Sequence, residues 1–184
     1  YYAARGPHRV VGRMLFMDEF DVAAIKLAPD QPVPGPDMRK LPLPFESLQA
    51  FQFPRERKQY LVTGFPQSRT KANPHTQIVK SQPQGFRLAS AAPEQYESLG
   101  LTDQHHLVFG FDVKGMVFPD GKPRQVADPS GMSGSPLWLL FDEAEPDKRS
   151  ILPAVGVVIE HHRDRKLLVA ADIAVAIHLI NETD

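Results

Sequence analysis

The chain has 184 residues, 42% of them hydrophobic, which suffices for one large domain or two small ones with a packed core. Its 21 basic and 22 acidic residues leave a formal net charge of −1, so charge favours neither nucleic acid nor an anionic membrane as a partner. No run of about 18 apolar residues is present, so we expect no membrane span. Cysteine is absent. Because secreted domains of this size often use disulfides, we expect a cytoplasmic location, with a periplasmic one left open.

Strand-like runs separated by turn residues follow one another along the chain, and 18 dispersed prolines argue against long helices. We expect strands at 10–17, 20–27, 60–63, 77–80, 86–90, 106–113, 137–141, 151–160 and 166–170. The polar, proline-rich segment 28–44 is interpreted as a surface loop, and 94–100 as a short helical turn. A helix is expected over 172–180, with Asp172 as its N-cap and apolar residues at 173, 176, 177 and 180. Short strands at such spacing predict an all-β sandwich or barrel.

The segment best suited to chemistry is Gly131-Met132-Ser133-Gly134-Ser135-Pro136, which precedes an apolar strand. Acyl transfer by a serine needs an exposed hydroxyl beside donors for the developing oxyanion, and backbone N–H groups converge only where the chain bends tightly. Glycine permits such a bend, so the amides of Gly131 and Ser133 are candidates for one oxyanion hole. The alternative is an ordinary Gly/Ser/Pro loop between strands. The elbow of α/β-hydrolases is disfavoured, because Ser135 stands where that motif has glycine and no βαβ alternation surrounds it.

This segment resembles the G-D-S-G-G-P signature of trypsin-like serine proteases, which have the chymotrypsin fold, and most of all the bacterial variants without an acidic residue before the serine. Three further segments resemble strands of that family in the family's order. They are 20–27, whose Asp21 matches the triad aspartate, 60–66, similar to V-x-G-[YWF]-P, and 154–158, similar to the strand that follows the serine. The resemblance implies an all-β fold of two antiparallel β-barrels, the first incomplete, with a C-terminal helix. It implies a remainder of the first barrel with the proline-rich loop over 1–75, and a second barrel with the terminal helix over 76–184.

The chain departs from the family pattern at two points. The family has a histidine several tens of residues before the aspartate, whereas the one histidine before Asp21 is His8, which lacks the T-A-A-H-like context. We therefore expect the histidine-bearing strands to lie outside this chain, cleaved off or on another polypeptide, and something to cover the strand edges that this leaves open. Met132 replaces the acidic residue that pairs with a freed N-terminus in zymogens, so that route of activation is not expected.

Asp21 has a structural alternative, because an aspartate can simply end a strand. Burying its carboxylate on an apolar strand would be costly unless the charge is paired, and a histidine partner would pair it. We therefore assign Asp21 the role of holding the histidine in the tautomer that accepts the serine proton.

The resemblance also implies where substrate binds. It places the base of the substrate pocket at Ala127, with Asp128 beside it, and a wall at Ile159, Glu160 and His161, which could equally be a solvated strand end. Asp128 favours a basic substrate side chain over small or apolar ones, or else bonds its own turn before a proline. The adjacent pairs His105-His106 and His161-His162 lack metal-ligand spacing, so we expect no metal site, and the chemistry needs no cofactor.

Together these features predict a serine endopeptidase that forms an acyl-enzyme on Ser133. A histidine upstream of this chain would act as base and then acid, Asp21 would orient it, and the amides of Gly131 and Ser133 would stabilise the oxyanion. The expected partners are a protein or peptide substrate and a regulatory domain or subunit, since uncontrolled cleavage would harm a cytosol. The alternative is a catalytically inactive pseudoprotease that serves as a binding or scaffolding module, which the missing histidine supports.

Overall fold

The computed structural model describes residues 12–27, 43–50, 58–73, 75, 78–118, 120–142 and 152–182. Its strands are β1 (Gly12–Met17), β2 (Val22–Leu27), β3 (Lys58–Gly64), β4 (Thr70–Asn73), β5 (Ile78–Ser81), β6 (Gln84–Ala89), β7 (His106–Gly110), β8 (Met116–Val117), β9 (Pro123–Arg124), β10 (Pro136–Asp142), β11 (Ala154–His162) and β12 (Leu167–Asp172). The helices are α1 (Pro93–Leu99) and α2 (Ile173–Asn181), and short 3-10 turns form η1 (Asp18–Phe20), η3 (Phe45–Ser47) and η4 (Gln67–Arg69).

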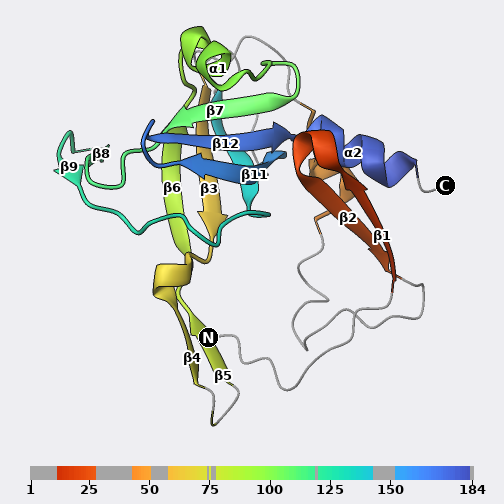
Figure 1. The fold of residues 1–184 in the computed structure, drawn as a ribbon, viewed down its shortest axis with the longest axis horizontal. Coiled ribbons are helices and arrows are strands. Elements are labelled where there is room, and N and C mark those ends of the chain that lie inside the picture. Colours follow the sequence, from red (N-terminus) through yellow and green to blue (C-terminus); the bar gives the residue numbers. More distant parts are fainter. Residues whose placement is uncertain are drawn as a thin grey trace.

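The body of the molecule is a curled antiparallel sheet of six strands in the order β6-β3-β10-β11-β12-β7 (Figure 1). The curl brings its two edge strands together, because Ser90 just after β6 forms an antiparallel bridge with Phe109 of β7. The amide of Ala91 then donates to the carbonyl of Val108 over 2.8 Å. The sheet therefore wraps around one core and leaves little edge exposed where β6 and β7 meet.

Alternation of side chains explains how this sheet encloses its core. Along β6, Phe86 and Leu88 are buried while Arg87 between them is exposed, as the period of two in a strand requires. The enclosed cluster also takes large side chains from the other strands, including Tyr60, Val62, Leu107, Phe109, Leu137 and Leu168. On β12, by contrast, all six residues are buried, because α1, α2 and neighbouring loops cover its outer face.

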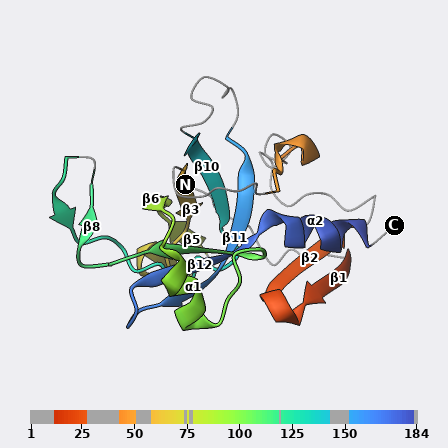
Figure 2. The same cartoon turned by 90° about the horizontal axis from the view of Figure 1, so that it is seen from above.

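A separate hairpin, β1–β2, packs on α2 beside the sheet (Figures 1 and 2). Leu15, Met17 and Val22 face a small core built around Val175 and Leu179 of the helix. The opposite face of the hairpin exposes Met14, Phe16 and Ile25, and Met14 pairs directly with Ile25 across the two strands. The hairpin thus has one packed face and one apolar face exposed to solvent among the residues described.

The start of α2 is confirmed, since the Asp172 side chain accepts a hydrogen bond from the amide of Ala174 over 2.8 Å. Its predicted apolar face is partly wrong. Ile173 is buried, but so are Val175 and Leu179, whereas Ile180 is 40% exposed. The reason is that α2 contacts the hairpin as well as β11 and β12, so its buried surface is wider than a single stripe.

The predicted strands agree with the structure to within a few residues at their ends, and the mainly β class with a terminal helix is confirmed. Phe20 is an exception, because it lies in η1 and β2 begins only at Val22. The predicted division after residue 75 would cut β3 from its neighbours β6 and β10 in the sheet. His8 and most of the proline-rich segment 28–44 lie outside the described residues. Within those residues, no helix is long and apolar enough to cross a bilayer.

Candidate active site

The serine turn, residues 130–136, joins the loop after β9 to the start of β10. Gly131 and Gly134 both have φ of 84°, a left-handed backbone that favours glycine, so the two glycines create the bend on either side of Ser133. Ser133 is exposed, and its Oγ donates a hydrogen bond to the carbonyl of Ile159 over 2.7 Å. The bend therefore presents a serine hydroxyl at the surface next to β11.

The backbone amides of this turn fall into two groups. Those of Met132, Gly134 and Ser135 donate to the carbonyls of Pro129, Val158 and Met132 over 2.8–2.9 Å. Those of Gly131 and Ser133 have no acceptor anywhere in the described part of the chain. Unpaired amides at this position are what an oxyanion hole requires, because a donor already used by the protein cannot bind a substrate oxygen.

Neighbouring segments hold the turn from three sides. The amide of Gln67 in η4 donates to the carbonyl of Ser130 over 2.8 Å, and Val158 of β11 bonds both Gly134 and Ser135. Met132 is only 1% exposed and packs in the main core, so the residue before Ser133 serves as an anchor. The end of β3 packs closely against the turn at Gly64. A Cβ added to Gly64 would lie 2.2 Å from Ser135 Oγ and 2.9 Å from Met132 Cε.

Asp21 lies at the tip of the β1–β2 hairpin. It is exposed, has φ of 50°, and its amide donates to the carbonyl of Asp18 over 3.3 Å. Its neighbours connect it to the serine turn: Phe20 packs against the same small core as Ile159, whose carbonyl accepts the Ser133 hydroxyl. Phe20 and Ile159 thus pack against one small core, whereas Asp21 itself is exposed and has no hydrogen bond to Ser133 or to a described histidine.

None of the six described histidines is hydrogen-bonded to Ser133. His105 and His106 both contact the ring of Phe20, with centroids 5.0 and 5.8 Å away, and His106 Nδ1 lies 3.2 Å from the carbonyl of Thr102. Groups of three or more His, Cys, Asp or Glu side chains that could hold a metal ion are absent from the described residues.

A pocket of about 320 Å³ lies beside the turn, lined by residues 111–114 after β7 and by Gln125 and Asp128 before the turn. His161 near the end of β11, and Arg163 and Lys166 between β11 and β12, complete the lining. Its size is at the low end of the range for ligand pockets, roughly 300–1,000 Å³. Two of the residues expected to bind substrate, Asp128 and His161, therefore line one pocket. We call it the His161 pocket.

Asp128 makes its interactions within the protein. Its Oδ1 accepts hydrogen bonds from the amide and hydroxyl of Ser130, the amide at 2.9 Å, and its Oδ2 pairs with Arg163. Burial acts to raise the pKa of Asp128, but the bonds from Ser130 and the charge of Arg163 outweigh it and lower that pKa. The alternative that Asp128 bonds its own turn is confirmed, and its charge is already matched.

His161 differs from Asp128 in its hydrogen bonding. Both ring nitrogens are shielded from water and lack a hydrogen-bond partner among the described residues, and the ring packs edge-on to Phe111 at 5.5 Å. Burial lowers the pKa of His161 below its ordinary value of 6.5, and nearby Arg163 and His162 lower it further, against the opposing effect of Asp128. An unpaired imidazole is unusual enough in a protein interior to call for a partner.

The other expected substrate-binding residues lie apart from this pocket. Ala127 packs against the main core, and Glu160 is exposed and paired with His162 over 3.0 Å. Ile159 is an extra residue in β11, because Val158 pairs with Ala170 and Glu160 with Val169, and such a bulge redirects the strand locally. Sequence reasoning missed Gln67, Arg163 and Lys166, which reach this region through contacts far apart in sequence and carry no local signal.

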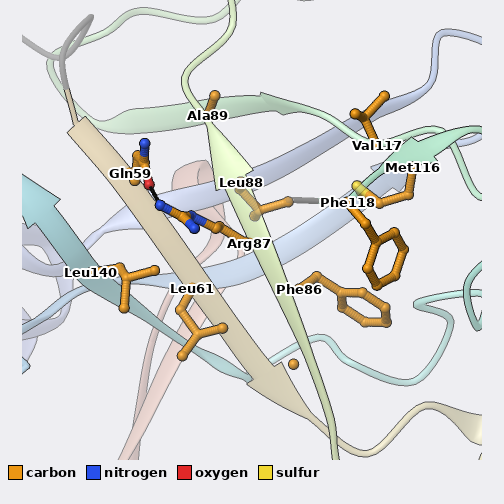
Figure 3. A pocket seen from close by; sticks show the side chains of 11 residues that line it. Gln59, Leu61, Phe86, Arg87, Leu88, Ala89, Met116, Val117, Phe118 and Leu140 are labelled. Carbon is orange, nitrogen blue, oxygen red and sulfur yellow. Dashed lines mark hydrogen bonds between the residues drawn. The ribbon is translucent and has the colours of Figure 1, made fainter. Parts of the chain in front are cut away.

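A larger hollow of about 540 Å³ lies between β3, β6 and the short β8–β9 arm (Figure 3). Its lining is mainly apolar, and the two polar side chains that Figure 3 labels, Gln59 and Arg87, bond each other. The residues that line this hollow offer neither a nucleophile nor an acid–base pair.

Searches of the chain against protein-family models and against curated protein sequences found no match.

Proposed function

We propose that this protein is a serine endopeptidase of the trypsin-like kind, which cleaves peptide bonds through an acyl-enzyme on Ser133. One observation carries the proposal: an exposed serine hydroxyl stands in a bend whose amides at Gly131 and Ser133 are unpaired, while the amides between and after them are bonded. Acyl transfer by serine needs this combination of an accessible nucleophile and free backbone donors.

The proposed reaction follows from these groups. An imidazole supplied from outside the described residues takes the Ser133 proton while Oγ attacks the peptide carbonyl, and the two amides bind the oxygen that becomes negative. The protonated imidazole then gives its proton to the leaving amine, and water releases the acyl group in the same way. Ser133 Oγ must first leave its bond to the Ile159 carbonyl, which a side-chain rotation allows.

Asp21 is proposed to orient that imidazole, and the β1–β2 hairpin to be the remainder of a first β-barrel packed on α2. Because Asp21 is exposed, its substitution tests chemistry with little effect on stability. We expect Asp21→Asn to slow acylation by roughly 10³–10⁴-fold, since the amide no longer favours the reactive tautomer. A rate within about tenfold of the wild type would remove Asp21 from the mechanism.

Reaction with a fluorophosphonate probe tests the proposed nucleophile. With the histidine-bearing segment present, we expect the wild type to be labelled, Ser133→Ala to be unlabelled, and Ser130→Ala to keep its labelling because the Ser130 hydroxyl is used in a bond to Asp128. Ser130 is a suitable control, since it lies in the same turn three residues away. Labelling that survives in Ser133→Ala would contradict the proposal.

A second candidate is a pseudoprotease that binds other proteins without cleaving them. It is favoured by one observation, that the Ser133 hydroxyl bonds a backbone carbonyl and no described histidine. An unlabelled wild-type chain would support this candidate. Incubation with casein separates a third case, in which the serine reacts but turnover is slow, as we expect if a partner domain or subunit controls the enzyme.

A further inference from the structure

Among the described residues, the His161 imidazole stands out because neither of its ring nitrogens has a hydrogen-bond partner. It borders a pocket of about 320 Å³, yet both its nitrogens lack a partner among the described residues. A buried polar group without a hydrogen bond is unfavourable, so a site of this kind is expected to receive a partner from outside the chain.

The charges around the pocket show what partner fits. Asp128 is paired with Arg163, and Asp112 with Lys166 over 2.7 Å, so both acidic side chains of the lining are neutralised. Lys114 also lines the pocket and has no acidic partner among the described residues. Lys114 and the imidazole of His161 therefore remain without a partner among the described residues. Together they suit a hydrogen-bond acceptor that carries a negative charge.

The pocket is also placed to meet a substrate. Asp128 lies five residues before Ser133, and His161 lies two residues after Ile159, whose carbonyl holds the Ser133 hydroxyl. The two segments that form the candidate active site therefore continue directly into the two main walls of the pocket.

We propose that the His161 pocket receives the carboxylate of an acidic side chain, glutamate above all, from the residue on the N-terminal side of the bond to be cleaved. This inference rests on the proposed endopeptidase function. It replaces the expectation that Asp128 favours a basic side chain, because the carboxylate of Asp128 is already bonded to Ser130 and Arg163.

Burial lowers the pKa of His161 and so favours the neutral imidazole, whereas the negative charge of an entering carboxylate would act in the opposite direction and favour the protonated form. The charged groups around it are Asp128, Arg163 and His162, with Asp112, Lys114 and Lys166 on the rest of the lining. Since the ring nitrogens are covered, entry requires neighbouring side chains to move. Arg163 and Lys166 are long, with side chains 65% and 63% exposed.

The first test compares peptides that differ only at the residue before the cleaved bond, with glutamate, glutamine, lysine or phenylalanine there. We expect kcat/KM for glutamate to exceed that for glutamine by at least about tenfold, since a bond to a charged group replaces one to a neutral group. His161→Gln should abolish this preference, whereas His162→Gln, changed at the neighbouring histidine that pairs with Glu160, should keep it. Equal preference in wild type and His161→Gln overturns the inference.

The second test does not depend on catalysis. In the full-length Ser133→Ala chain, the nitrogen NMR signals of His161 are followed while N-acetyl-glutamyl amide or its glutaminyl analogue is added. We expect a shift towards the protonated imidazole with the glutamyl compound alone. No shift would overturn the pocket assignment even in an active enzyme. A shift in this variant, combined with a wild-type protein that fluorophosphonate does not label, would keep the pocket and reject the proposed function.

Discussion

The serine turn and the His161 pocket lie side by side but are built in opposite ways. The turn is defined by its backbone: two glycines with φ of 84° and amides of residues 130–135 that are either hydrogen-bonded or without an acceptor among the described residues. The pocket is defined by side chains from separate segments, joined by the ion pairs Asp128–Arg163 and Asp112–Lys166. Because the turn depends on backbone geometry, we expect substitutions there to be poorly tolerated. Because the ion pairs of the pocket are exposed, we expect that changing one of their charges costs little stability.

The largest effect is expected where the backbone of the turn is forced to change. In Gly131→Ala the alanine would have to adopt a left-handed φ, which is strained for a residue with a Cβ. The added Cβ would also lie 3.2 Å from both the backbone nitrogen and the Cβ of Gln67. We expect a loss of about 2–4 kcal/mol in the free energy of unfolding, measured by urea denaturation. Labelling by the fluorophosphonate should slow by about 10²-fold at the same time, because the Gly131 amide shifts.

Gly134→Ala provides the matched comparison. Gly134 has the same φ of 84°, but no atom lies within 4 Å of the added Cβ. We expect only the cost of the left-handed backbone, about 1–2 kcal/mol in the same urea experiment. If Gly134→Ala proved as damaging as Gly131→Ala, the contact with Gln67 would not be what holds the turn.

We expect the free energy of unfolding to depend on pH through His161, the imidazole that borders the pocket. Because the pKa of His161 is lower in the folded chain than its ordinary value of 6.5, the unfolded chain binds more protons below neutrality. The stability that depends on neutral His161 is therefore complete above that value and is lost as the pH falls through the folded pKa. Urea denaturation from about pH 8 down to about pH 5 should show this fall, and His161→Gln should flatten it. An unchanged slope in His161→Gln would place the titration elsewhere.

The smallest effect on stability is expected from Arg163→Gln. The Arg163 side chain is 65% exposed, so removing its pair with Asp128 should change the unfolding free energy by less than about 1 kcal/mol. Its electrostatic effect should be clear nonetheless: the pKa of Asp128 should rise, as followed by carboxyl-carbon NMR, because Arg163 helps to lower it. The unmatched Asp128 charge should also weaken the preference for an acidic substrate side chain. A large loss of stability would mean that the pocket is as rigid as the turn.

Much of the fold could be predicted because its strands carry local signals. The strands from β3 to β12 that form the six-stranded sheet were all expected from alternating or continuous apolar runs. Of the two short hairpins, β5 was expected, whereas β4, β8 and β9 were not, since strands of two to four residues are too short to show a period of side chains. The membership of β3 in the same sheet as β10 was also missed, because strand pairing depends on contacts between residues more than seventy positions apart, such as Leu137 and Val62.

The candidate site likewise contains residues that could be identified from the sequence and interactions that could not. Gly131, Ser133 and Gly134 could be singled out from the sequence, because a tight bend needs glycine at particular positions. For Asp128 the sequence left two interpretations open, a contact with a basic substrate or a bond within its own turn, and it did not reveal the arginine that pairs with it 35 residues further along. His161 could be named as a wall residue, but nothing in its neighbours predicts that both ring nitrogens would lack a partner.

The sequence by itself determined the local features of this protein: where strands run, where α2 begins at Asp172, and where the chain must bend around Ser133. These follow from backbone sterics and from the period of side chains, which act over a few residues. The tertiary structure alone decided which amides stay free, which charges cancel and which imidazole is left without a partner. Those outcomes depend on groups brought together from distant segments, and hydrogen bonds and ion pairs are sensitive to distances that only the packed fold sets.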